Sequence, residues 1–303
     1  MASDGPEVEK PEADEPQADR PQVEKAVDAA ADAVDAAVDD AVSKVDDALD
    51  ELTGVPTDDG EIEEFAYDGA TLIAERRGDA ASTRTVVLVH GIGMGRKVFA
   101  DLTRHLERDA CVVALDLPGY GDAPEPPRTP TMERLGDLVA AYLRHLDRGP
   151  VTLIGHSMGT QVVTETAVRH PATVRRLVLV APTVDRHHRN AFSQLWRLGL
   201  DLLGESPRVL IMGAREYVRA GPNLRRKMTA MLVHRPEHSY PRIAAPTLVI
   251  RGEGDRCAPP PWCDEVVAAI PDAESVEIAG HGHETLIRDA GPAAEAIRPF
   301  AGL

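Results

Sequence analysis

The sequence predicts an α/β protein with a mostly parallel, doubly wound sheet, preceded by an acidic extension. From residue 61 onward, short β-branched runs such as 85–89 alternate with amphipathic stretches long enough for helices. One apolar run, 151–154, leads through a Gly-rich turn into a helical stretch. The chain has 303 residues, 43% of them hydrophobic, which is enough for one large core with a decoration.

Residues 1–60 form a separate compositional region. They carry 19 acidic and 4 basic residues, whereas residues 61–303 carry 31 acidic and 29 basic residues. The first 22 residues are rich in Pro, Glu, Asp and Ala and are expected to stay disordered. Small apolar residues recur at three- and four-residue steps over 23–53, which indicates a partly stable amphipathic helix. The alternatives for this helix are a solubilising tail and a self-association or docking element.

The elements expected from residue 61 follow the alternation in order. The Asp68-Gly69 pair between two short runs predicts a hairpin, and Thr131 is a plausible N-cap. The expected strands are 62–67, 71–76, 85–89, 111–115, 151–154, 177–180, 247–251 and 275–278. The expected helices are 97–107, 131–146, 157–169, 262–270 and 293–300.

Residues 184–244 interrupt the alternation because they are too long for one crossover. We expect an inserted helical cap there, between core segments 61–183 and 245–303. The cap carries 11 basic and 5 acidic residues. This positive charge has three interpretations. The basic residues lie on ordinary solvated helix faces, they attract an anionic substrate or an acyl carrier, or they form the surface on which the acidic tail folds back. Apolar cap residues proposed to face an acyl or alkyl group are Phe192, Leu195, Trp196 and Met228.

The strongest functional signal is the segment Gly155-His156-Ser157-Met158-Gly159. It follows a predicted strand and opens a predicted helix. A serine in this context lies on a tight turn that exposes its hydroxyl and points the helix N-terminus toward a developing oxyanion. Ser157 is therefore the candidate nucleophile.

A serine hydroxyl needs a base, and two histidines follow the last predicted strand. His283 is preferred over His281 because Gly280 and Gly282 place a flexible loop directly before it. His281 is then a neighbour that lines the pocket. This position lies at the edge of the sheet where open α/β sheets bind ligands.

The acid that orients the base is expected after the preceding strand. Asp255 is preferred there, because its carboxylate can accept the Nδ1–H of His283. Glu253 and Asp185 remain alternatives, since each follows the end of a strand.

The oxyanion hole requires two backbone donors. Met158, the residue after the nucleophile, is expected to supply one, and Ile92 in the loop after strand 85–89 the other. The residues expected to line the substrate pocket are His156, His281, Phe192 and Trp196.

Taken together, these motifs resemble the α/β-hydrolase superfamily in its capped, esterase-like branch. The resemblance covers residues 61–303 and includes His90-Gly91 and the run Asp116 to Gly121. It implies the assignments above and a structural role for Asp116. Superfamily enzymes that open epoxides or carbon–halogen bonds use an Asp nucleophile, and this chain has Ser157 at that place.

Composition bounds the remaining functions. No clustered basic face indicates nucleic-acid binding, and no run of about 18 apolar residues predicts a membrane span. Cys111, Cys257 and Cys263 contain no Cys-x-x-Cys pair, so neither a zinc site nor a disulfide framework is expected. The expected compartment is the cytoplasm, and the expected partner is a small acyl substrate with an apolar group.

The predicted function is hydrolysis of a carboxylic ester or related acyl bond through an acyl-enzyme, without metal or organic cofactor. Carbon–carbon hydrolase, thioesterase, perhydrolase and acyltransferase activities remain alternatives on the same triad. An interaction protein that uses the N-terminal helix is the alternative from another class.

Overall fold

The computed structural model describes residues 60–189, 223–287 and 289–303, all within the compact unit Thr57–Leu303. The predicted disorder of residues 1–22 and the predicted helix over 23–53 lie outside the described residues, as do Phe192, Leu195 and Trp196 of the predicted cap. None of the helices in the described ranges combines the length and apolar character that crossing a bilayer requires.

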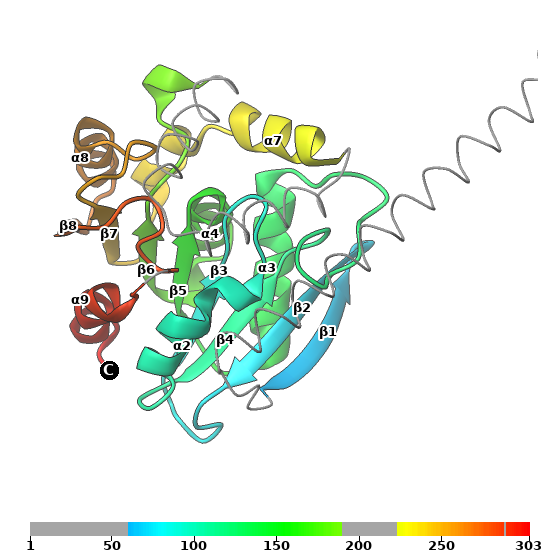
Figure 1. Cartoon of the computed structure of the whole chain (residues 1–303). Helices are drawn as coiled ribbons and strands as arrows, with labels where there is room; N and C mark the ends of the chain where they lie inside the picture. The colour runs from blue at the N-terminus through cyan, green and yellow to red at the C-terminus, as the bar shows by residue number, and fades with distance from the viewer. Residues whose placement is uncertain (1–59, 190–222, 288) are drawn as a thin grey trace, which may run out of the picture. The chain divides into compact units, whose positions relative to one another are not determined.

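The described strands form one eight-stranded sheet in the order β1-β2-β4-β3-β5-β6-β7-β8 (Figure 1). The β1–β2 and β2–β4 pairs are antiparallel, and every later pair is parallel. The predicted mostly parallel sheet is therefore confirmed. The strands are β1 (Glu61–Tyr67), β2 (Ala70–Arg77), β3 (Thr85–Val89), β4 (Cys111–Asp116), β5 (Val151–His156), β6 (Val174–Val180), β7 (Thr247–Gly252) and β8 (Ala273–Ile278).

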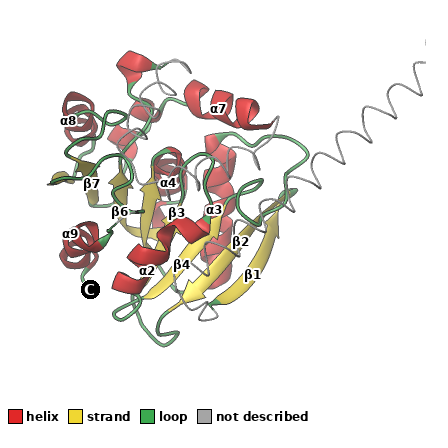
Figure 2. Cartoon of the chain, in the orientation of Figure 1, coloured by secondary structure: helices red, strands yellow, loops and turns green. Residues whose placement is uncertain are grey.

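Helices cover both faces of this sheet (Figure 2). Alternate residues of each central strand belong to different clusters: Val87 belongs to the one that includes residues of α3, α4 and α8, and Val86 and Leu88 belong to the one that includes residues of α2 and α9. This two-sided burial explains why the central strands are continuous apolar runs. The α-helices of the core are α2 (Ala100–Leu106), α3 (Met132–Leu146), α4 (Met158–Arg169), α8 (Pro260–Ala269) and α9 (Gly291–Ala301).

Most predicted elements lie within a few residues of their positions in the structure. The hairpin turns at Asp68-Gly69, and the Thr131 side chain accepts a hydrogen bond from Arg134 N–H as the N-cap of α3. The predicted helix over 97–107 is instead a 3-10 turn, Arg96–Phe99, followed by α2. Strand β6 begins three residues earlier than predicted because Arg175 and Arg176 interrupt its apolar pattern.

Part of the predicted cap is described. It contains the helix α7 (Leu224–Val233), and short 3-10 turns lie at Arg186–His188, Pro236–His238 and Tyr240–Arg242. Helix α7 is joined to α4, because Gln161 Nε2 donates hydrogen bonds to the carbonyls of Thr183 and Met231, the latter at 3.2 Å. The 3-10 turn Pro171–Thr173 connects α4 to β6.

Candidate active site

Ser157 lies on the tight turn between β5 and α4. Its φ of 53° and ψ of −119° lie in a region that L-residues rarely adopt. Gly155 and Gly159 make this turn possible, since a Cβ on Gly155 would lie 2.5 Å from the Gly159 carbonyl oxygen and one on Gly159 would collide with the carbonyl of Val89. The Ser157 N–H donates to the Val180 carbonyl at 2.9 Å. The hydroxyl is thus held at the carboxyl end of a central strand.

His283 and Asp255 come together with this hydroxyl although they lie far from it in the sequence. His283 Nε2 is 3.0 Å from Ser157 Oγ, and His283 Nδ1 is 3.0 Å from Asp255 Oδ2. All three residues are at least 93% buried. The arrangement lets Nε2 accept the serine proton while Nδ1–H continues to donate a hydrogen bond to the carboxylate.

The Asp255 carboxylate is held by its own loop. Asp255 Oδ1 accepts hydrogen bonds from the backbone N–H groups of Cys257 and Ala258 at 2.8 and 2.9 Å. Burial opposes ionisation, but His283 and these two donors outweigh it and hold the pKa of Asp255 below its usual value. The carboxylate is therefore charged at neutral pH, as an orienting group requires.

The alternative acids and base have other contacts. Glu253 Oε2 accepts the N–H of Gly280 at 3.0 Å, and Asp185 Oδ1 accepts the N–H of His187 at 2.9 Å. The carbonyl of His281 accepts the N–H of Gly254 at 2.8 Å. These residues join or cap loops, whereas Asp255 and His283 are the pair that meets Ser157.

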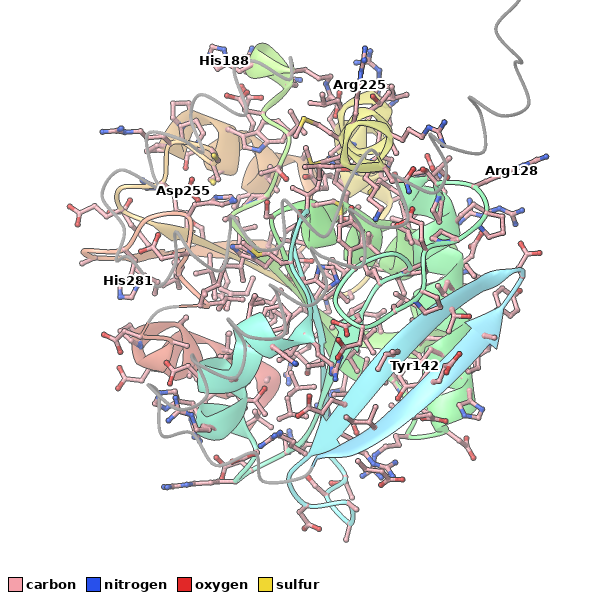
Figure 3. The ribbon with its side chains drawn as sticks, turned by 45° about the vertical axis from the view of Figure 1, so that its right-hand side comes forward. Arg128, Tyr142, His188, Arg225, Asp255 and His281 are labelled. Carbon is pink, nitrogen blue, oxygen red and sulfur yellow. The ribbon has the colours of Figure 1, made fainter. Side chains whose placement is uncertain are left out.

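The loops after β7 and β8 are joined directly to each other. A Cβ on Gly252 would lie 2.5 Å from the His281 carbonyl oxygen, so only glycine permits this approach. Glu253 N–H donates to the carbonyl of Ile278 at 2.9 Å. Figure 3 shows Asp255 and His281 on one side of the molecule, away from Tyr142. The loops that carry Asp255 and His283 are therefore connected through their backbones.

The loop after β3 lies against Ser157. A Cβ on Gly91 would be 3.0 Å from Ser157 Cβ. His90 is fully buried; its Nε2 accepts Leu117 N–H at 3.1 Å, so its Nδ1 carries the proton and donates to the Gly91 carbonyl at 2.7 Å. Because C=O and N–H point in opposite directions in a trans peptide, this bond turns the Ile92 N–H away from the His90 ring. Among the described contacts, no protein acceptor takes up the N–H of Ile92 or Met158.

His156 has a different position from the pocket wall expected for it. It is fully buried, and its Nε2–H donates to the carbonyl of His283 at 2.8 Å. Burial, with the nearby His283, lowers the pKa of His156 to about 4. The side chain therefore supports the His283 loop from beneath as a neutral donor.

Asp116 is also fully buried and organises a turn. It accepts hydrogen bonds from the N–H groups of Arg96 and Asp122 and pairs with the Arg96 guanidinium. A Cβ on Gly121 would collide with its carboxylate. These contacts agree with the structural role that the resemblance implied.

Lys227 of α7 is a contact that sequence reasoning missed. Its side chain is 2% exposed; Nζ donates to the Gly119 carbonyl, pairs with Glu125 at 2.6 Å and lies 4.4 Å from the centre of the Tyr120 ring. The Tyr120 hydroxyl in turn donates to Met158 Sδ at 3.5 Å. A sequence signal for its burial was present, because Lys227 lies four residues before the buried Met231 and therefore on the same face of the helix. The charge of Lys227 is therefore buried and paired, and it does not lie on a solvated helix face.

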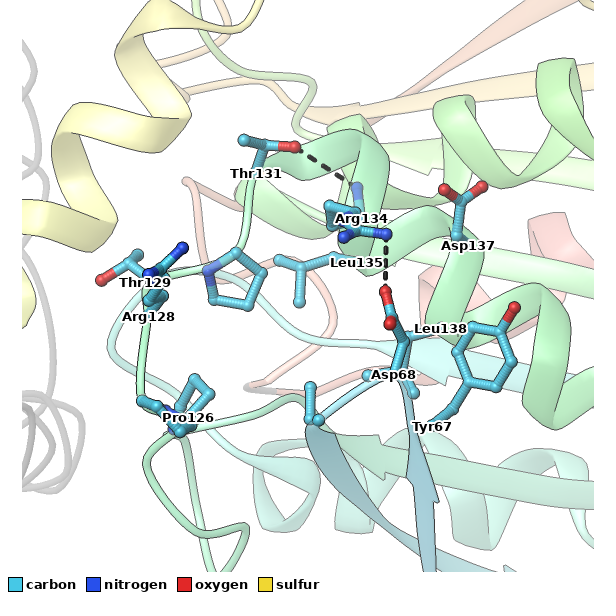
Figure 4. Close-up of a pocket in the computed structure, with 14 residues that line it drawn as sticks. Tyr67, Asp68, Pro126, Arg128, Thr129, Thr131, Arg134, Leu135, Asp137 and Leu138 are labelled. Carbon is cyan, nitrogen blue, oxygen red and sulfur yellow. Dashed lines mark hydrogen bonds and ion pairs between the residues drawn. The ribbon is translucent and has the colours of Figure 1, made fainter.

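Two hollows elsewhere in the described part are lined by neither Ser157, Asp255 nor His283. One of about 400 Å³ lies between the β1–β2 hairpin and residues 126–131, and Figure 4 shows Arg134 paired with Asp68 at its wall. The other, about 450 Å³, lies beside α7 and includes Glu165 and His234, whose Nε2 is 3.0 Å from Glu165 Oε1. In the second hollow the Ser239 hydroxyl also donates to Glu165 Oε1, at 2.5 Å, so Ser239 and His234 share one carboxylate oxygen.

A parallel sheet with a serine on a strained strand-to-helix turn, and a His–Asp pair on the last strand ends, defines the α/β-hydrolase fold. Comparison with known proteins agrees: the model of the α/β hydrolase family matches residues 86–296. The chain belongs to this family, and its relatives include esterases.

Curated relatives include the pimeloyl-[acyl-carrier protein] methyl ester esterases of Neisseria meningitidis and Chromobacterium violaceum. The first is 39% identical over 107 residues, 35% of this chain and 33% of that protein. The second is 30% identical over 176 residues, 56% of this chain and 67% of that protein. Some matches are thus short: the alignment spans about two fifths or less of the Neisseria esterase and of the (E)-2-((N-methylformamido)methylene)succinate hydrolase of Acinetobacter baylyi.

Solved structures share the fold over most of this chain. A hydrolase from Pseudomonas aeruginosa superposes with a TM-score of 0.69 at 24% identity, covering 80% of this chain and 99% of that one. The enol-lactonase of Burkholderia xenovorans superposes with a TM-score of 0.67 at 20% identity, covering 80% and 100%. At these identities the likeness concerns the fold.

Proposed function

We propose that this chain is a serine hydrolase that cleaves a carboxylic ester or a related acyl bond through an acyl-enzyme. The observation that carries the proposal is the alignment of Ser157 Oγ, His283 and Asp255, with Oγ 3.0 Å from Nε2 and Nδ1 3.0 Å from the carboxylate. This is the geometry that proton transfer from a serine nucleophile requires.

In the proposed reaction, Ser157 Oγ attacks the substrate carbonyl while His283 Nε2 accepts the hydroxyl proton. Asp255 keeps the Nδ1–H in place and stabilises the imidazolium. The N–H groups of Ile92 and Met158 hold the oxyanion. His283 then protonates the leaving group, and a water molecule attacks the acyl-enzyme with His283 as the base.

The proposed substrate is a small acyl compound with an apolar group. Support comes from apolar residues around the Ser157 turn: Met158 follows Ser157 and contacts Tyr120, and Ile92 and Met228 pack against the same buried cluster. The name of one relative, a methyl ester esterase, also concerns an acyl–oxygen bond. Thioester, carbon–carbon and acyl-transfer reactions use the same attack on a carbonyl and differ in the leaving group or acceptor.

The proposed compartment is the cytoplasm. The three cysteines are free thiols, and all three are buried, which accords with a reducing compartment. Fractionation of the source cells tests this, and recovery in an extracytoplasmic fraction contradicts it.

The test is hydrolysis of p-nitrophenyl esters of increasing chain length by the wild-type chain and by Ser157→Ala. Turnover that is lost in the variant supports the proposal, and the optimum chain length sizes the acyl site. A fluorophosphonate probe should label Ser157 in the wild type and not the variant. A folded wild type that neither turns over esters or thioesters nor reacts with the probe contradicts it.

A further inference from the structure

The proposed base His283 and the acid Asp255 form a cluster with a third potential metal ligand, Cys257. Asp255, Cys257 and His283 each offer one ligand atom, and these atoms lie within 4.8 Å of one another. Their exposed fractions are 3%, 3% and 7%. We propose that this cluster binds a thiophilic divalent cation such as Zn²⁺, and that the bound cation switches the hydrolase off.

The donor set suits zinc. Zn²⁺ prefers thiolate sulfur, imidazole nitrogen and carboxylate oxygen in tetrahedral geometry at about 2.0–2.3 Å, which separates its ligand atoms by roughly 3.3–3.8 Å. His283 Nδ1 and Asp255 Oδ2 are already 3.0 Å apart. The ligand atom of Cys257 lies within 4.8 Å of both, and rotation about its one side-chain bond changes the position of the sulfur. Water supplies the fourth ligand.

The Asp255 loop leaves one oxygen for the cation. Oδ1 accepts the backbone N–H groups of Cys257 and Ala258, whereas Oδ2 is the oxygen nearest His283 Nδ1. The cation therefore takes the place of the Nδ1 proton. It does not have to break the backbone bonds that hold the carboxylate.

Inhibition follows from the proton balance. When Zn²⁺ bonds to Nδ1, the ring proton of neutral His283 moves to Nε2, and the Cys257 thiol releases its proton to solvent. One proton is thus released for each cation bound. An Nε2 that carries a proton cannot accept the one from Ser157, so the nucleophile is not activated.

The other two cysteines provide matched controls. Cys263 lies on α8, its thiol contacts the Ala258 carbonyl at 3.5 Å, and burial raises its pKa to about 12. Cys111 lies at the start of β4, and burial raises the pKa of its thiol as well. Neither belongs to the cluster of potential ligands.

Inhibition by the bound cation rests on the proposed hydrolase function, whereas binding of the cation does not. The first measurement is therefore of metal binding alone. Titration of the full chain with Co²⁺ should produce thiolate-to-cobalt charge-transfer and tetrahedral d–d absorption at one equivalent, and Zn²⁺ should abolish both. Cys257→Ser should weaken Zn²⁺ binding by roughly 100-fold, because one of four ligands is lost. Cys263→Ser should bind as the wild type does. Equal Co²⁺ spectra in wild type and Cys257→Ser would overturn the proposal.

A second measurement keeps the test independent of the stability of that variant. In the wild type, Zn²⁺ should protect Cys257 from alkylation by iodoacetamide at least tenfold, as mapped by peptide mass spectrometry. Alkylation of Cys257 at the same rate with and without saturating Zn²⁺ would overturn the proposal.

A third measurement is ester hydrolysis, in which the rate of each variant with Zn²⁺ is compared with its own rate without metal. Zn²⁺ should suppress ester hydrolysis by the wild type and by Cys263→Ser in parallel with Co²⁺ displacement, and Cys257→Ser should require roughly 100-fold more Zn²⁺. Zn²⁺ binding at Cys257 with undiminished hydrolysis would overturn the switch. Zn²⁺ binding in a chain that hydrolyses nothing would contradict the proposed function and leave the metal site standing.

Discussion

The turn that carries Ser157 and the loops that carry Asp255 and His283 are built by different physical means. Steric exclusion sets the turn, since Gly155 and Gly159 are the residues that let β5 and α4 meet so closely. The loops after β7 and β8, near one edge of the sheet, are held mainly by hydrogen bonds, with one close backbone approach at Gly252. A steric constraint leaves a strict residue pattern in the sequence, whereas backbone hydrogen bonds leave almost none.

The largest expected effect is the loss of activity in Ser157→Ala without a loss of stability. Ser157→Ala should lower kcat by about 10⁴-fold or more, because the nucleophile is lost. Its free energy of unfolding should stay close to that of the wild type, since the turn has the same φ and ψ requirement for both residues. Ester kinetics and urea unfolding of the two proteins measure this. Residual turnover within tenfold of wild type would remove Ser157 from the mechanism.

Next in size is the change at the hydrogen-bonded loop. Asp255→Asn should lower kcat by about 10³-fold while KM changes little, because an amide favours the wrong His283 tautomer. Glu253→Gln in the same loop is the control, and its kcat should stay within a few fold. If both variants lose activity equally, Asp255 has no special role as the orienting acid.

Gly159→Ala tests the steric half of the comparison. The added Cβ would collide with the Val89 carbonyl and lie 2.7 Å from that of His90, so we expect a loss of about 3 kcal/mol in unfolding free energy. Gly149→Ala is the matched control: its φ is +71° and nothing lies within 4 Å, so only about 1 kcal/mol of strain is expected. Thermal or urea unfolding that ranks the two variants the other way contradicts the steric account.

The smallest effect concerns His156 beneath the His283 loop. Its pKa is about 4 in the folded chain and 6.5 in the reference state, so the unfolded chain binds more protons between these values and stability falls as pH drops through this window. We expect this residue to account for a loss of about 2 kcal/mol between about pH 7 and about pH 5. His156→Gln keeps a donor for the His283 carbonyl, removes the titration and should flatten the curve by that amount. An unchanged pH dependence of unfolding would contradict this assignment.

Prediction from the sequence worked best where one local cause acts. The run 85–89 matches β3 to the residue, because burial on both faces requires a continuous apolar strand. The turn at 155–159 was found because its glycines are sterically required. The helix over 97–107 was less accurate, since its first turn is a 3-10 turn whose backbone is held by Asp116, twenty residues away.

Long-range contacts escaped prediction for a common reason. His156 was expected in the pocket wall, but its place is set by the carbonyl of His283, 127 residues later. Lys227 was counted as a cap charge, although Gly119 and Glu125 bury it. The carbonyls of His283 and Gly119 have no sequence signal as partners, because any backbone carbonyl can accept a hydrogen bond.

The sequence by itself determined the α/β class, the strand order along the chain and the serine turn, because each depends on local periodicity or on close backbone packing. Only the tertiary structure decided which histidine and which carboxylate meet Ser157. It also decided that Cys257 lies against the pair and that His156 lies beneath it. The physical reason is that the crossovers of a parallel sheet bring distant strand ends to one edge, and their side chains become neighbours only once the sheet has formed.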